Sequence, residues 1–97
     1  MNKLEFYKAA LRRLKPELKR KYRVDTIGLF GSVVRKDFVS DKSDIDIIVD
    51  FTSHVGIEFI DLADFLESHL DHKVDLVSKK GVKPQYLRQI EPEIIYV

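Results

Sequence analysis

The chain has 97 residues and a formal net charge of +1, and 44% of its residues are hydrophobic and 34% charged. This length suits a single domain, residues 1–97, with one modest core, and the composition is typical of a soluble globular protein. The absence of cysteine excludes disulfides and thiolate metal sites, and because no apolar run has the length of a membrane span or the form of a signal peptide we expect a cytoplasmic protein without a membrane partner.

The small net charge hides two segments of opposite sign. Residues 1–23 contain nine Lys or Arg and two Glu, and residues 41–75 contain ten Asp or Glu and two Lys, so their formal charges are +7 and −8. These segments could be two solvated faces that attract each other across a small fold. The basic segment could instead bind phosphates or an acidic partner, and the sequence alone does not decide between the two interpretations.

The first half of the chain predicts a helical segment followed by two strands. Asn2 followed by Glu5 resembles a helix-capping pattern. Because Pro16 interrupts the backbone hydrogen bonds, we expect a first helix to about Leu14 and a short second one from about Pro16. Apolar residues at helical spacing mark this segment: Leu4, Tyr7, Leu11, Leu14 and Leu18. The following elements are expected to be a strand at 26–30, a turn and very short helix at 31–36, a polar loop at 37–43 and a central strand at 44–51.

The second half predicts a helix, a third strand, a short helix and an extended tail. The clearest helix covers 57–70, and the later elements are a strand at 73–77, a helix from Pro84 to about Glu91 and an apolar tail at 93–97. We expect the first two strands to be antiparallel, and the 57–70 helix allows a parallel crossover to the third strand. The predicted fold is therefore α/β, of the α+β type, with a small mixed sheet in the order 1-2-3 and helices packed on it.

Two aspartates separated by one residue open the second predicted strand, in the run Ser43-Asp44-Ile45-Asp46-Ile47-Ile48-Val49. Alternate strand residues point to the same face, so the carboxylates of Asp44 and Asp46 lie side by side. A hard cation such as Mg²⁺ between them relieves their repulsion and the cost of desolvation. The predicted topology brings Asp75 to the same end of the sheet. These three aspartates are the predicted metal ligands.

The first predicted strand ends on a glycine and a small hydroxyl residue, Gly31 and Ser32, which is typical of a turn that binds phosphate. Gly31 lets the backbone approach the phosphates, Ser32 would bind the β- and γ-phosphates, and Arg35 could neutralise the departing pyrophosphate. In nucleotidyl transfer, two divalent metals can stabilise the attacking and leaving oxygens. We expect Asp44 and Asp46 to hold them, and Asp75 to complete the metal for the incoming hydroxyl and to accept its proton.

These motifs resemble the minimal nucleotidyltransferases of the DNA polymerase beta-like superfamily. The resemblance covers nearly the whole chain and depends on Gly31-Ser32, Arg35, Ser43-Asp44-Ile45-Asp46 and Asp75. It implies the nucleotidyltransferase fold, nucleotide binding by Gly31, Ser32, Arg35 and Ser43, and Mg²⁺-dependent transfer of a nucleoside monophosphate, usually from ATP. Two departures stand out: eleven residues instead of the usual ten separate Ser32 from Asp44, and Lys36 follows Arg35 where the family often has glycine.

The resemblance also implies a partner. Small stand-alone members are commonly antitoxins paired with a HEPN-type ribonuclease toxin, and some attach AMP to a tyrosine of that toxin. Our first hypothesis is therefore an enzyme that transfers AMP to the hydroxyl, predicted to be a tyrosine, of a cognate toxin. The second is an antitoxin that blocks the toxin by binding alone, and the third is transfer to a small molecule such as an antibiotic.

Other partners and sites are not indicated. No basic and aromatic sheet of the kind that binds RNA is predicted, so we expect no direct nucleic-acid contact. The three histidines, His54, His69 and His72, do not have zinc-ligand spacing, and we expect the last two to be structural. An oligomer or a complex with the toxin is the expected assembly.

Overall fold

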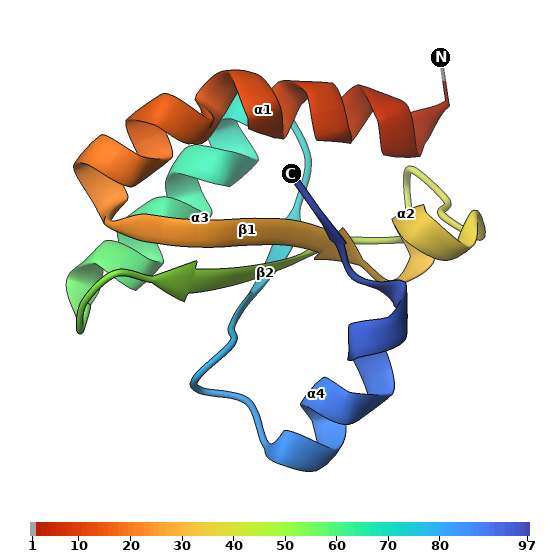
Figure 1. The fold of residues 1–97 in the computed structure, drawn as a ribbon. Coiled ribbons are helices and arrows are strands. Elements are labelled where there is room, and N and C mark those ends of the chain that lie inside the picture. Colours follow the sequence, from red (N-terminus) through yellow and green to blue (C-terminus); the bar gives the residue numbers. More distant parts are fainter. Residues whose placement is uncertain (1) are drawn as a thin grey trace.

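The chain forms a four-stranded mixed sheet with two helices on one face and a shorter helix on the other (Figure 1). The computed structural model describes residues 2–97. Its elements are α1 (Lys3–Tyr22), β1 (Val24–Phe30), α2 (Ser32–Arg35), β2 (Ile45–Phe51), α3 (Ile57–Leu70), β3 (Val74–Ser78), α4 (Pro84–Ile90), the 3-10 turn η1 (Glu91–Glu93) and β4 (Ile95–Tyr96). The predicted α+β class is confirmed.

The first helix is continuous over 20 residues, so the predicted break near Pro16 is wrong. At its start the Glu5 N–H donates to the Asn2 side chain over 2.8 Å, which is the predicted cap. Pro16 lies on the exposed side of α1, where water can hydrogen-bond the carbonyl that has lost its donor. Leu11 and Leu18, on either side of this point, are both fully buried. Their packing holds both halves of the helix against the sheet.

The strand order is β3-β2-β1-β4. Strands β1 and β2 are antiparallel, and β2 and β3 are parallel, which confirms the predicted directions and the predicted adjacency of the first three strands. The three-stranded count is wrong, because the tail adds a fourth strand: β4 pairs with β1 and aligns Tyr96 with Gly28. A Cβ atom on Gly28 would come within 2.9 Å of Ile94 Cγ2, so glycine at this position lets the tail approach β1 closely.

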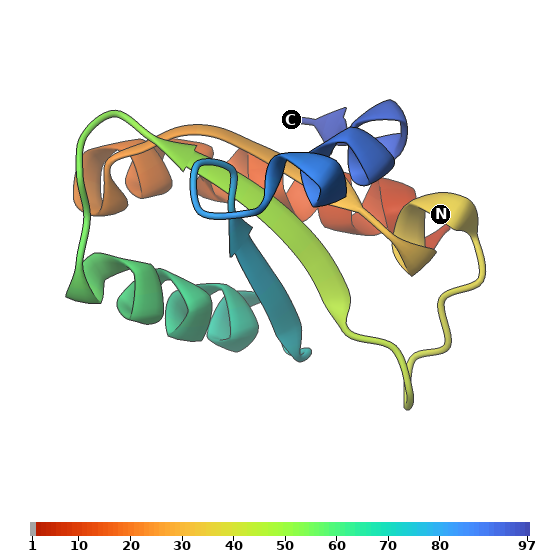
Figure 2. The ribbon, with the colours of Figure 1, turned by 90° about the horizontal axis from the view of Figure 1, so that it is seen from below.

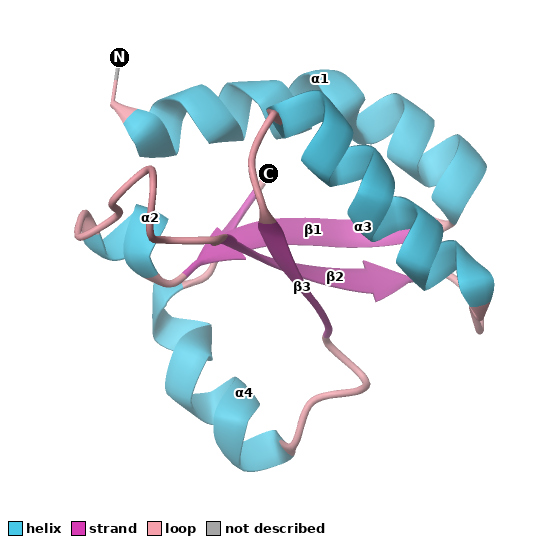
Figure 3. Cartoon of the chain, turned by 180° about the vertical axis from the view of Figure 1, so that it is seen from behind, coloured by secondary structure: helices cyan, strands magenta, loops and turns pink. Residues whose placement is uncertain are grey.

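Both faces of β2 are covered, which explains why its sequence is apolar almost throughout. Ile45, Ile47 and Val49 face the large core beneath α1 and α3, and Figure 3 shows these two helices together on that face. Ile48 points the other way and packs with Phe30 and with Ile90 of α4. Figure 2 views the sheet from the α4 side. Asp46 alternates with Ile45 and Ile47, so it belongs to this second face.

The two oppositely charged segments do not pair with each other. Among residues 2–97, the ion pairs are Lys8–Glu5, Arg35–Asp37, Arg35–Glu93 and Lys80–Asp50, and none of them joins residues 1–23 to residues 41–75. The attraction across the fold that we considered from the sequence therefore has no direct contact in this part of the chain. No helix within the same residues combines the length and apolar character needed to cross a membrane.

Candidate active site

Two acidic side chains meet where β2 and β3 begin. The parallel register places Asp46 of β2 beside Asp75 of β3, so both side chains project from the same face of the sheet. Asp44 lies one residue before β2 and is exposed, whereas Asp46 is half-buried. The predicted convergence of Asp46 and Asp75 follows from the parallel pairing of β2 and β3, which α3 connects.

Asp46 is the strongly perturbed member of this pair, since its pKa is raised from its ordinary value of 3.8 to about 6. Burial is the largest cause of this rise, and the negative charges of Asp75 and Asp44 and a hydrogen bond with Asp75 act in the same direction. The positive charge of Arg35 opposes the rise. A negative charge on the Asp46 carboxylate is therefore unfavourable unless a proton or a bound cation neutralises it.

The carboxylate oxygens of Asp44, Asp46 and Asp75 suit a hard divalent cation, although the three side chains do not form a complete coordination site in this conformation. Within residues 2–97, no group of three or more His, Asp or Glu side chains is close enough to hold a metal ion. His69 and His72 have other partners: the Nδ1 atom of His69 is 2.9 Å from the carbonyl oxygen of Phe65, and the Nε2 atom of His72 is 2.8 Å from that of Ser40. These contacts fit the structural role expected for both histidines.

The turn between β1 and α2 lies against Asp46. Gly31 has a φ of +75°, in the region that favours glycine. A Cβ atom at this position would overlap Oδ2 of Asp46, so a larger residue would collide with the carboxylate. The antiparallel register places Phe30 opposite Asp46 and thereby fixes this approach. The predicted phosphate-binding turn is thus in direct contact with Asp46, one of the three predicted metal ligands.

Glu93 is a residue of this site that our sequence analysis missed. The N–H of Gly31 donates to Oε1 of Glu93 over 3.0 Å, and Nη1 of Arg35 donates to the same oxygen over 3.1 Å and to Oε2 over 3.3 Å. These donors belong to Gly31 and Arg35, two of the residues that the sequence assigns to phosphate binding. Glu93 is separated from them by about sixty residues of sequence, and no motif or periodic pattern marks it.

The remaining predicted residues lie around this turn. Ser32 is the first residue of α2 and Arg35 is the last, with an exposed side chain. Lys36 follows with a φ of +72°, a left-handed conformation that explains why glycine suits this position in the family. The Ser43 hydroxyl accepts a hydrogen bond from the Val39 N–H over 3.0 Å, so it closes the 39–43 loop, and its role in nucleotide binding remains a prediction.

Tyr86 of α4 also faces the acidic site. Burial raises its pKa, and the charges of Asp46, Asp75 and Glu93 add to the rise. Tyr86 is 41% exposed, so the phenol is open to solvent while it lies within the electrostatic influence of the three carboxylates. Our sequence analysis did not identify Tyr86, because nothing in its local pattern relates α4 to the start of β2.

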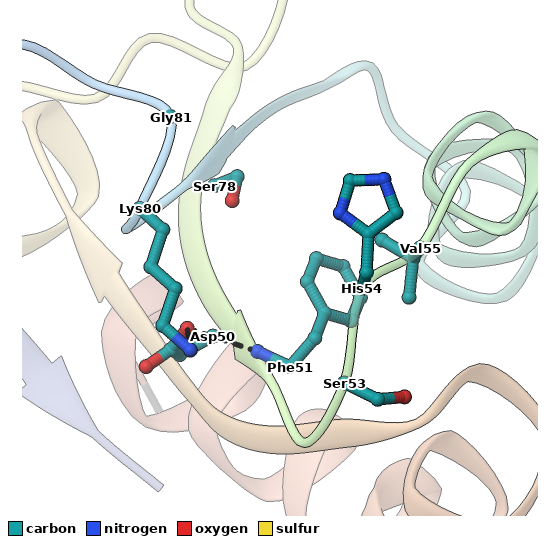
Figure 4. A pocket seen from close by; sticks show the side chains of 8 residues that line it. All are labelled: Asp50, Phe51, Ser53, His54, Val55, Ser78, Lys80 and Gly81. Atoms are coloured by element: carbon teal, nitrogen blue, oxygen red, sulfur yellow. Dashed lines mark hydrogen bonds and ion pairs between the residues drawn. The ribbon is translucent and has the colours of Figure 1, made fainter.

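A hollow of about 490 Å³ lies at the opposite end of β2 (Figure 4). Its lining consists of Asp50, Phe51, Ser53, His54, Val55, Ser78, Lys80 and Gly81. The Lys80 ammonium group is 3.7 Å from the Asp50 carboxylate, so the two charges in this hollow already face each other. None of the predicted site residues lines it, and we place the chemistry at the Asp46 end of the strand.

Comparison with known proteins decides the family. The family described as Nucleotidyltransferase domain matches residues 11–97. The chain belongs to this family. The resemblance to minimal nucleotidyltransferases and the assignment as a transferase are therefore confirmed. The chain is 39% identical over 95 residues to the protein adenylyltransferase MntA of Thermococcus cleftensis, covering 97% of this chain and 95% of MntA.

Two solved structures share the fold. One is a toxin-antitoxin complex with AMP-PNP, with a TM-score of 0.71 and 29% identity over 87% of this chain and 69% of the other. The second is the complex of tri-AMPylated Shewanella oneidensis HEPN toxin with MNT antitoxin, with a TM-score of 0.66 and 27% identity over 92% of this chain and 69% of the other. The predicted nucleotidyltransferase fold is thereby confirmed.

Proposed function

We propose that this nucleotidyltransferase transfers AMP from ATP, with Mg²⁺, to a tyrosine hydroxyl of a cognate HEPN-type toxin and thereby acts as its antitoxin. The observation that carries the proposal is the contact of the Gly31 turn with Asp46, which lies beside Asp75 in the sheet. A phosphate-binding turn and a cation-binding carboxylate pair are the two parts that a metal-bound nucleotide needs. The adenylyltransferase and toxin-antitoxin relatives support the choice of AMP and of a protein acceptor.

The residues have distinct roles in this proposal. Asp44, Asp46 and Asp75 would hold Mg²⁺, two ions in the complete site, and the bound metal would stabilise the negative charge that develops on the attacking and leaving oxygens. The Gly31 N–H and the Arg35 guanidinium bind the terminal phosphates, together with Ser32 and Ser43. Asp75 is the more exposed of the two paired acids, so it is placed to take the proton of the incoming hydroxyl.

A protein is the acceptor that we propose for this site. Residues 2–97 form one sheet with its helices, and Asp44 and Asp75 are exposed at the start of β2 and β3, where a partner can reach them. A partner protein brings its own binding surface and presents a side-chain hydroxyl to the exposed acidic site. The structure of the AMPylated HEPN toxin in complex with its MNT antitoxin supports this arrangement.

The direct test is incubation of the purified chain with labelled ATP, Mg²⁺ and the toxin encoded beside it. We expect label on a toxin tyrosine, loss of that label in the double variant Asp44→Ala, Asp46→Ala, and loss of toxin neutralisation in the same variant. Asp41→Asn is the matched control, because Asp41 is an exposed acid in the preceding loop. An unlabelled toxin with a folded wild-type chain would refute the proposal.

A second function, neutralisation by binding alone, is favoured by one observation. Glu93 already accepts hydrogen bonds from the Gly31 N–H and from Arg35, so a nucleotide must displace it to reach these two donors. If steric blocking is the function, the double aspartate variant will protect against the toxin as fully as the wild type does. Circular dichroism of the variant must first show that the fold is intact.

A further inference from the structure

The carboxylate of Glu93 occupies the phosphate-binding turn from within the chain. It accepts hydrogen bonds from the Gly31 N–H (3.0 Å) and from Arg35 (3.1 and 3.3 Å). The Glu93 side chain is 24% exposed and that of Arg35 54%, so this contact lies at the edge of the site, within reach of solvent and of a ligand. The turn η1 that carries Glu93 is anchored on one side by the α4 core through Ile90 and Ile94 and on the other by the β4–β1 pairing.

A carboxylate and a phosphate oxygen cannot occupy the same position on one backbone N–H. Both are anions that prefer convergent N–H and guanidinium donors, so a triphosphate bound at this turn must displace Glu93. If the carboxylate stayed nearby, its charge would also repel the nucleotide. Glu93 therefore weakens nucleotide binding, and this effect is independent of the three aspartates.

We propose that Glu93 sets the affinity for nucleoside triphosphates by competing with their terminal phosphates for Gly31 and Arg35. This inference rests on the proposed function, because it takes the Gly31 turn as the phosphate site. Removing the carboxylate should tighten the binding of ligands that carry β- and γ-phosphates, and it should leave a ligand without them unaffected. A role in positioning Arg35 for the nucleotide predicts the opposite sign, since the loss of Glu93 would then weaken binding.

The test is calorimetry of Glu93→Gln with Mg²⁺-ATP and with AMP. The glutamine side chain would keep an oxygen that can accept the Gly31 hydrogen bond, but the ion pair with Arg35 and the repulsion of phosphate are lost. Since a partly exposed ion pair contributes at most about 1 kcal/mol, we expect the Kd for ATP to fall by about fivefold or less, with no change for AMP. The matched control is Glu91→Gln, which removes the same charge from the exposed side of the same turn.

The outcomes separate the inference from the proposed function. The inference is supported if Glu93→Gln binds ATP more tightly than the wild type and Glu91→Gln does not. If Glu93→Gln binds ATP as tightly as the wild type or more weakly, the inference is overturned while the proposed function stands. Equal tightening for AMP would also overturn it, because the effect would not involve the terminal phosphates. If neither the wild-type chain nor the variants bind ATP in the presence of Mg²⁺, the proposed function and the inference fail together. Glu93→Ala, which removes the whole carboxylate, repeats the measurement if Glu93→Gln does not fold.

Discussion

Replacing Asp46 with asparagine should stabilise the folded chain at neutral pH in the absence of metal. The pKa of Asp46 is raised from 3.8 to about 6 in the folded protein, so the folded state holds the proton more tightly than the unfolded state does. The stabilisation that comes from this proton is complete below pH 3.8 and is lost as the pH rises through about 6. Asparagine does not ionise, so the variant avoids this loss.

The size of the effect follows from the shift. A rise from 3.8 to about 6 would correspond to about 3 kcal/mol at 1.36 kcal/mol for each pH unit. Asp46 is only half-buried, so solvent screening reduces the effect, and we expect a gain of about 1–2 kcal/mol for Asp46→Asn. For a domain of this length such a gain raises Tm by roughly 5–10 °C.

Urea unfolding at about pH 4 and about pH 7.5 tests the reasoning, because the two conditions bracket the titration of Asp46. The difference in unfolding free energy between Asp46→Asn and wild type should be larger at the higher pH. Asp41→Asn, at an exposed loop position, should show little change at either pH. A variant that is no more stable than wild type at the higher pH, or a difference that does not grow with pH, would refute the account of strain in the acidic pair.

Three further predictions concern the same region. Gly31→Ala should lose about 2–4 kcal/mol of unfolding free energy, because its Cβ would collide with Asp46 and its φ of +75° disfavours a side chain; a loss below the error of urea unfolding would contradict the close approach. Lys36→Gly should gain about 1 kcal/mol by the same measurement, since Lys36 has a φ of +72°; a less stable variant would show that the strain is compensated. Asp75→Asn should lower the pKa of Asp46 below about 6 in an NMR titration, because one of the negative charges that raise it is removed; an unchanged pKa would mean that the two side chains do not interact.

Local patterns in the sequence predicted most of the elements. The 57–70 helix has the predicted bounds, because its apolar residues recur at helical spacing along its whole length. The strand alternation placed Asp46 on one face of β2, and the parallel crossover placed Asp75 beside it. The break at Pro16 was the clearest error, since the buried stripe on both sides of the proline outweighs one lost hydrogen bond at an exposed position.

The sequence by itself determined which residues are candidates for the site: Asp44 and Asp46 at the start of a central strand, Asp75 in the next strand, and the Gly31 turn before them. Only the tertiary structure decided that the tail forms β4, that Glu93 binds Gly31 and Arg35, and that the charges of the acids act on Tyr86. The physical reason is the range of the interactions. Helix and strand periodicity comes from neighbours a few residues apart and is visible in the sequence, whereas the hydrogen bonds of Glu93 and the pairing of β4 with β1 join segments that meet only when the whole sheet has formed.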